Sequence, residues 1–208
     1  MAARTLLLHR ALWLERLTIV WNVGEAAIAL GAGWLAGSIA LVGFGLDSVI
    51  ETVAAAALYR RLRAEQRGAS EEEAEAHERR ALWIVGLTFF LLSAYVAFEA
   101  IGTLWTRQPP AISRIGLILA AASLVVMPAL AIAKHRAGKA LGSRALLADA
   151  KETFVCSYLS LTLLAGLGLN ALLGWWWADP IAALAMLPFV LHEGREALED
   201  ARADRTEA

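Results

Sequence analysis

The chain has 208 residues, of which 59% are hydrophobic, and its mean hydropathy is +0.55. This composition is too apolar for an ordinary soluble domain and is typical of a membrane protein. A formal net charge of −1, with the basic residues in short runs between apolar segments, excludes a nucleic-acid-binding surface, and the single cysteine, Cys156, excludes an intramolecular disulfide framework.

Six apolar runs have the length of about 20 residues that an α-helix needs to cross a bilayer. They lie near residues 17–36, 39–59, 81–104, 113–133, 145–168 and 178–194. Gly37 and Ser38 alone connect the first two runs, and Pro109-Pro110, which cannot continue a helix, separates the third from the fourth. We therefore expect an all-α, polytopic membrane protein with six transmembrane helices.

The basic residues indicate which side of the membrane each connection faces. The connections with positive charge contain Arg4, Arg10, Arg16, Arg60, Arg61, Arg63, Arg67, Arg79, Arg80, Lys134, Arg136, Lys139, Arg144, Arg195, Arg202 and Arg205. By the positive-inside rule these connections and both termini are cytoplasmic, whereas the opposite side holds only Arg107 and Arg114. The expected location is a bacterial inner membrane. The predicted regions are a cytoplasmic amphipathic segment at 1–16, a six-span domain at 17–195 and a cytoplasmic tail at 196–208.

Two acidic residues, Asp47 and Glu51, lie within the apolar segment 37–51. A charge loses its water in hydrocarbon, so carboxylates within a span usually face a cavity, a partner or a bound cation. Their spacing of four residues places both on one face of a helix, about one turn apart. The alternative is that both are protonated residues that serve only in packing.

A short internal repeat relates this segment to a later one. GSIAL at 37–41 recurs as GSRAL at 142–146, and the positions nine residues after the two serines are Asp47 and Glu152. The positions four residues further on are Glu51 and Cys156. The shared offset to paired polar positions makes a chance match the weaker explanation.

The two copies are antiparallel, because the span with Asp47 runs toward the cytoplasm and the span with Cys156 runs away from it. Inverted repeats commonly form a binding site near the bilayer midplane. If the two spans pack together, Glu51 lies level with Glu152 and Asp47 lies level with Cys156. The four side chains then converge.

Three carboxylates and one thiol are a ligand set for a divalent cation. The sulfur favours zinc over magnesium or calcium, and four protein ligands suit tetrahedral zinc. Because the same groups bind either metal or protons, competition between the two is the physical basis of an exchanger. For Cys156 alone the alternative is strong, since a lone buried cysteine is usually a small hydrophobe.

Four further polar residues lie in or near these spans. Asn22 and Glu25 are candidates for hydrogen-bonding the ligands, or else for joining helices to each other. Asp149 is expected near the cytoplasmic edge, either on the access route of the ion or simply hydrated. Lys151 either extends to the inner surface or neutralises a carboxylate when metal is absent.

The GSxAL sequence stands before acidic positions in both copies, and the last span opens with Trp177-Ala178-Asp179-Pro180-Ile181. Together these features resemble the membrane domain of a cation diffusion facilitator. The resemblance covers roughly residues 17–195. It implies a six-span, usually dimeric metal-proton antiporter with a tetrahedral site on its second and fifth spans. The ligands carried over by position are Asp47, Glu51, Glu152 and Cys156. The usual site instead has a histidine or aspartate and an aspartate on each helix.

The resemblance is greatest to the short branch of that family, which lacks the cytoplasmic C-terminal domain, so dimerisation through membrane helices is expected. The predicted function is proton-coupled export of a divalent metal, zinc above all, without a prosthetic group. The alternative is a non-transporting membrane protein, a metal-sensing or assembly partner on the same scaffold. An enzyme is not expected, because no histidine lies in the span of Cys156 or at any mid-membrane position to activate the thiol.

Overall fold

The computed structural model describes residues 2–67, 71–108 and 110–203, and within these ranges the chain forms six helices. The helices are α1 (Ala2–Ala36), α2 (Ile39–Arg67), α3 (Glu71–Thr106), α4 (Arg114–Leu141), α5 (Arg144–Leu173) and α6 (Ala178–Ala203). The six apolar runs of the sequence thus each correspond to one helix, as predicted.

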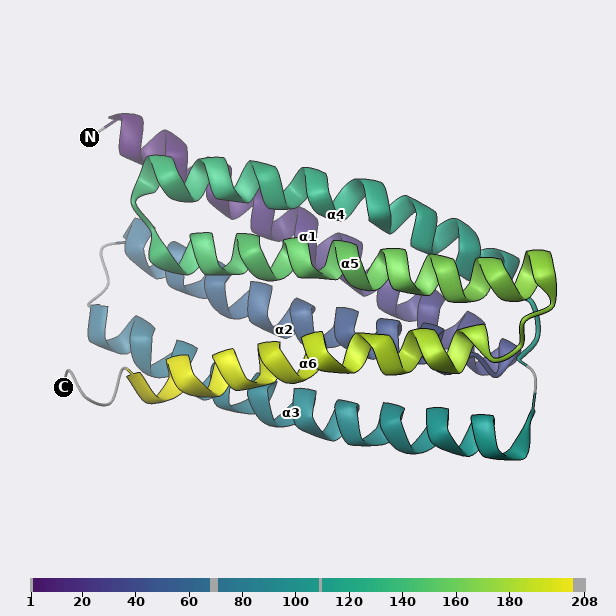
Figure 1. The fold of residues 1–208 in the computed structure, drawn as a ribbon. Coiled ribbons are helices and arrows are strands. Elements are labelled where there is room, and N and C mark those ends of the chain that lie inside the picture. Colours follow the sequence, from purple (N-terminus) through teal and green to yellow (C-terminus); the bar gives the residue numbers. More distant parts are fainter. Residues whose placement is uncertain (1, 68–70, 109, 204–208) are drawn as a thin grey trace.

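The helices lie side by side as an elongated bundle with their axes roughly aligned (Figure 1). Helices α1, α2, α5 and α4 form a ring in which each packs against the next, and α4 closes the ring on α1. Helices α3 and α6 form a pair that packs against this ring mainly through α2 and α5. The beginning of α1 and the end of α6 lie at the same end of the bundle, as an even number of spans requires (Figure 1).

Five of the described helices, α1 to α5, contain stretches that are long and apolar enough to cross a membrane. The charged residues of α6 set it apart, since Asp179, Glu193 and Arg195 fall within a length that would have to span the bilayer. Helix α6 nevertheless packs along α3 within the same bundle. The protein is therefore an integral, multi-pass membrane protein.

Helices α2 to α5 extend past the ends of the expected apolar runs, and two helices cross the expected boundaries between membrane and cytoplasmic regions. Helix α1 runs without interruption through the amphipathic segment 1–16 into the first span. Helix α6 continues beyond residue 195 to Ala203. The division at these two points into membrane and cytoplasmic regions remains a prediction.

The repeated Gly-Ser pair has a local structural role in both copies. Gly37 and Gly142 adopt the left-handed conformation, with φ of 63° and 68°, which glycine reaches without the steric cost of a Cβ atom. The serine that follows caps the next helix, because Ser38 Oγ accepts from Leu41 N at 3.2 Å and Ser143 Oγ accepts from Leu146 N at 3.3 Å. Each pair therefore ends one helix and begins the next within two residues.

Helices α1 and α2 approach closely at Gly45. A Cβ atom at this position would lie 2.9 Å from Leu30 Cγ and 3.0 Å from the backbone nitrogen of Leu30. The missing side chain allows the backbones to pack, as small residues do in membrane helix pairs. This contact brings the polar residues of α1 next to the acidic residues of α2.

Candidate metal centre

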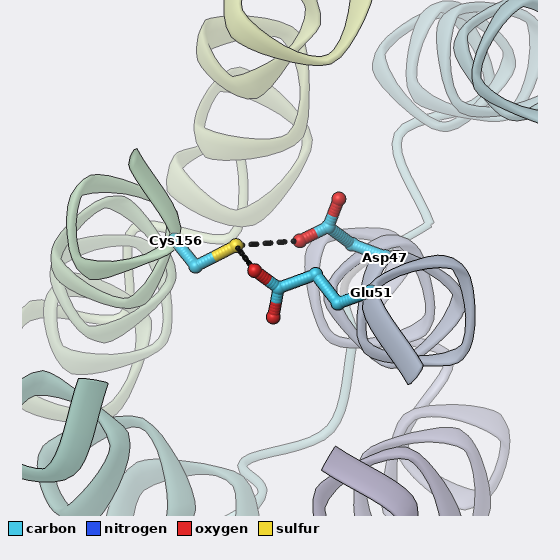
Figure 2. A group of neighbouring side chains, drawn as sticks. All are labelled: Asp47, Glu51 and Cys156. Carbon is cyan, nitrogen blue, oxygen red and sulfur yellow. Dashed lines mark hydrogen bonds between the residues drawn. The ribbon is translucent and has the colours of Figure 1, made fainter. Parts of the chain in front are cut away.

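Asp47 and Glu51 of α2 and Cys156 of α5 meet in the interior of the bundle (Figure 2). All three side chains are buried, with at most 5% of each residue exposed. The two carboxylates come from the same face of α2, as their spacing predicts, and the thiol points at them across the α2–α5 contact.

The ligand atoms of the three residues lie within 4.8 Å of one another. Cys156 Sγ is 2.8 Å from Glu51 Oε1 and 3.3 Å from Asp47 Oδ2, and it donates to these oxygens. In tetrahedral zinc coordination a sulfur and an oxygen ligand are roughly 3.5 Å apart, given the usual metal–ligand bond lengths. The observed separations are close to this value, so only small side-chain movements would be needed to surround an ion.

Two residues of α1 extend the polar interior beyond these three. Asn22 Nδ2 donates to Glu51 Oε2 at 2.9 Å, which leaves Oε1 of the same carboxylate facing the thiol. Glu25 Oε2 accepts from Ser48 Oγ at 3.0 Å. Within the described residues, Asn22 Oδ1 and Glu25 Oε1 are buried without a hydrogen-bond partner. Asn22 therefore orients the Glu51 carboxylate directly, whereas Glu25 bonds to Ser48, the residue that follows Asp47.

Glu152, the fourth residue of the predicted set, does not belong to the group whose ligand atoms all lie within 4.8 Å of one another. It is half-buried on α5, near the carboxylates of Asp149, Glu193 and Asp47 and the ammonium of Lys134. The reason is the register of the two helices. Cys156 contacts both carboxylates of α2 and so lies between them, which places Glu152 further toward the cytoplasmic end than the level of Glu51.

Asp149 and Lys151 each form an ion pair. Asp149 Oδ2 is 2.6 Å from Lys134 Nζ of α4, and its side chain is 12% exposed. Lys151 Nζ is 2.7 Å from Glu196 Oε1 of α6, with 60% of the lysine side chain exposed. Asp149 is therefore mostly buried and paired, while Lys151 is mostly exposed and links the surfaces of α5 and α6.

Sequence reasoning did not single out Glu193 of α6. Its charge acts on Asp47 and on Glu152, and its Oε1 atom is buried without a hydrogen-bond partner among the described residues. The available signal was an acid within the apolar part of the last span. Packing of α6 against α2 and α5 carries Glu193, at the cytoplasmic end of the run 178–194, toward the centre.

Asp179 was noted only as part of a motif, but it holds the outer end of α2. The residue is 1% exposed. Oδ1 accepts from Ser38 Oγ at 2.5 Å, and Oδ2 accepts from the backbone N–H of Ile39 at 3.1 Å. A carboxylate at a helix N-terminus satisfies free N–H groups and interacts favourably with the helix dipole. Asp179 thus fixes the helix that carries two residues of the centre.

An apolar crevice lies beside Asp47 on the outer half of the bundle, between α2, α3, α5 and α6. Its walls are Ile39, Ala40, Gly43, Phe44, Asp47, Leu92, Ser93, Val96, Leu159, Met186, Leu187 and Val190. Apart from Asp47 itself, only Ser93 offers a polar side chain there. A hydrated cation would lose its water against such walls without replacement, so this crevice is not a polar path for an ion.

Comparisons with known proteins agree with this architecture. The cation efflux transmembrane domain family matches residues 16–204. The chain is also similar to a protein of Synechocystis sp. described as an uncharacterized transporter, with 27% identity over 194 residues that make up 90% of this chain and 63% of the relative. The expected bacterial inner membrane agrees with the cyanobacterial origin of this relative. With the family match covering nearly all of its helical bundle, the chain belongs to the cation efflux family of membrane transporters.

Proposed function

We propose that this cation transporter exports zinc from the cytoplasm in exchange for protons, and that Asp47, Glu51 and Cys156 bind the ion. The observation that carries the proposal is the convergence of one sulfur and two carboxylate oxygens in the buried interior. Three such groups from two packed helices have little reason to meet in an apolar bundle unless they bind a cation.

The choice of zinc rests on the sulfur. Thiolates prefer zinc and similarly soft ions, whereas magnesium and calcium prefer sites made of oxygen alone. Zinc takes four ligands in tetrahedral geometry. Glu152, one turn before Cys156 on α5, or a water molecule supplies the fourth ligand in this proposal.

The coupling to protons follows from the chemistry of the ligands. Cys156 Sγ lies 2.8 Å from Glu51 Oε1 and 3.3 Å from Asp47 Oδ2, and in this proposal the thiol keeps its proton while no ion is bound. A cysteine ligand binds zinc as the thiolate, so zinc binding releases that proton. Protons that return to the site from the outer side displace the ion, and the two species exchange.

The test uses purified protein in liposomes that contain a zinc-sensitive dye. An imposed zinc gradient should produce zinc uptake and a proton flux in the opposite direction, measured with a pH-sensitive dye. Glu51→Gln and Cys156→Ser should reduce zinc uptake toward that of protein-free liposomes. Glu99→Gln, which removes a carboxylate from α3 outside the centre, is the matched control and should transport as the wild type does.

Three results would contradict parts of the proposal. Full zinc flux in a variant in which Asp47, Glu51 and Cys156 are all replaced would refute the site. Stoichiometric zinc binding without flux in the wild type would favour the alternative, a metal-sensing or assembly partner built on the same scaffold. Zinc flux without proton movement would refute the coupling alone. Dimerisation through the membrane helices stays a prediction, tested by the mass of the protein in detergent.

A further inference from the structure

A second buried group of charges lies in the cytoplasmic half of the bundle, where α1, α4 and α5 meet. Lys134 Nζ of α4 is 2.6 Å from Asp149 Oδ2 of α5 and 3.3 Å from Glu15 Oε2 of α1. The side chains of Lys134 and Glu15 are fully buried. The ammonium also donates to Thr153 Oγ1 at 3.3 Å. One lysine thus joins three helices of the ring.

The lysine is tied closely to α5. Thr153 Oγ1, which accepts from the ammonium, itself donates to the backbone oxygen of Asp149 at 2.9 Å. Lys134 therefore contacts α5 at two positions one turn apart. These positions flank Glu152, and Cys156 follows one turn after Thr153 on the same helix.

The burial of this lysine calls for an explanation. Removing a charge from water is costly, and a buried ion pair contributes little net stability over an apolar replacement. Lys139, further along α4, keeps its charge at the surface. Buried ionic groups are best understood where they fix one arrangement of the packed elements. Here the element that Lys134 contacts twice is the cytoplasmic half of α5.

We propose that Lys134 is a positioning residue for the metal centre, an ionic anchor that holds α5 at the rotation and depth that bring Cys156 against Glu51. The anchor acts through Asp149 and Thr153 on one side and through Glu15 on the other. Glu51 and Cys156 are in contact at 2.8 Å, so a small rotation or slide of α5 would separate them. The metal part of this inference rests on the proposed function, whereas the anchoring of α5 does not.

The experiment uses the full chain in detergent and compares Lys134→Met, which removes the charge, with Lys134→Arg, which keeps it. Lys139→Met makes the same change at an exposed position of α4 and is the matched control. Because Cys156 is the chain's single cysteine, the rate of its alkylation by a small maleimide without metal reports directly on its packing. Zinc affinity by calorimetry and zinc flux in liposomes are measured on the same variants.

We expect Lys134→Met to raise the alkylation rate and to weaken zinc binding by about tenfold, the size of effect typical of residues that orient ligands. Lys134→Arg should restore most of both values, and Lys139→Met should match the wild type. Wild-type alkylation and zinc affinity in Lys134→Met would overturn the proposal. So would equal defects in Lys134→Met and Lys134→Arg, because the charge would then not be the cause.

Removing the lysine alone leaves two buried carboxylates without a counter-ion, so Lys134→Met can fail to fold. The variant that combines Glu15→Gln, Lys134→Met and Asp149→Asn removes all three charges with little change in volume, and it should fold. We expect this neutral variant to show the same faster alkylation and weaker zinc binding. Wild-type values there would overturn the anchor. Wild-type protein that does not bind zinc would instead refute the proposed function, while the alkylation rates still decide the anchor.

Discussion

The hydrogen bonds of Asp179 allow a quantitative prediction about the outer end of the bundle. Asp179→Ala removes the acceptor for Ser38 Oγ and for the backbone N–H of Ile39, and both groups are near the buried start of α2. Hydrogen bonds to a charged group contribute about 1.5–3 kcal/mol each, but Ser38 keeps its bond to Leu41 N at 3.2 Å. We therefore expect a loss of about 3 kcal/mol in the free energy of unfolding.

For a chain of this size, such a loss corresponds to a fall in Tm on the order of 10 °C. The assay is thermal unfolding of the purified protein in detergent, followed by intrinsic tryptophan fluorescence. The internal repeat provides the control. Ser143 caps α5 by accepting from Leu146 N, so Ser143→Ala removes an ordinary helix cap worth about 1 kcal/mol.

Paired variants at Ser38 and Asp179 test the same contact. Ser38→Ala and Asp179→Ala remove two partners of one contact, so the double variant should lose less stability than the two single variants added together. A fall in Tm for Asp179→Ala no larger than that for Ser143→Ala would refute the assignment of Asp179 as the anchor of α2. Full additivity of Ser38→Ala and Asp179→Ala would refute it as well.

Three other predictions concern the centre and the packing around it. Cys156→Ser should weaken zinc binding by about tenfold or more and raise the preference for manganese over zinc, because an oxygen replaces the soft ligand; competition calorimetry checks this, and an unchanged preference would contradict the role of the sulfur. Glu152→Gln should reduce zinc affinity less than Glu51→Gln, since Glu152 lies outside the group of three ligand atoms; equal losses would show that Glu152 moves in to bind the ion. Gly45→Ala should destabilise the protein by about 1–3 kcal/mol, because the added Cβ atom meets the backbone of α1, whereas Gly102→Ala has nothing within 4 Å and should leave Tm unchanged or slightly higher. A Tm for Gly45→Ala equal to that of the wild type would contradict the close approach of α1 and α2.

Much of the centre followed from sequence because its features are local. The spacing of Asp47 and Glu51 determines that both lie on one helix face, and the copy at 142–156 identified α5 as the partner helix. The depth of α5 relative to α2 did not follow, since it depends on side-chain packing along the whole interface. Cys156 therefore contacts both carboxylates, although counting residues placed it level with Asp47 alone.

The depth of α5 relative to α2 also explains why Glu152 lies outside the group of three ligand atoms. Residues four apart on a helix are about 6 Å apart along its axis, so only one residue of the α5 pair can lie between Asp47 and Glu51. The structure gives that place to Cys156, which contacts both carboxylates. Sequence reasoning identified the four candidates but had no means to decide which of the two from α5 takes it.

By itself the sequence determined the membrane class, the six helices and the connections at Gly37-Ser38, Pro109-Pro110 and Gly142-Ser143 that separate them. These depend on run length, on glycine and proline conformations and on serine caps, which act within a few residues. Only the tertiary structure decided that Lys134 joins Glu15 to Asp149 and that Asp179 caps α2. Each of these contacts joins residues far apart in the chain, and it exists only because the packed helices bring the faces that carry them together.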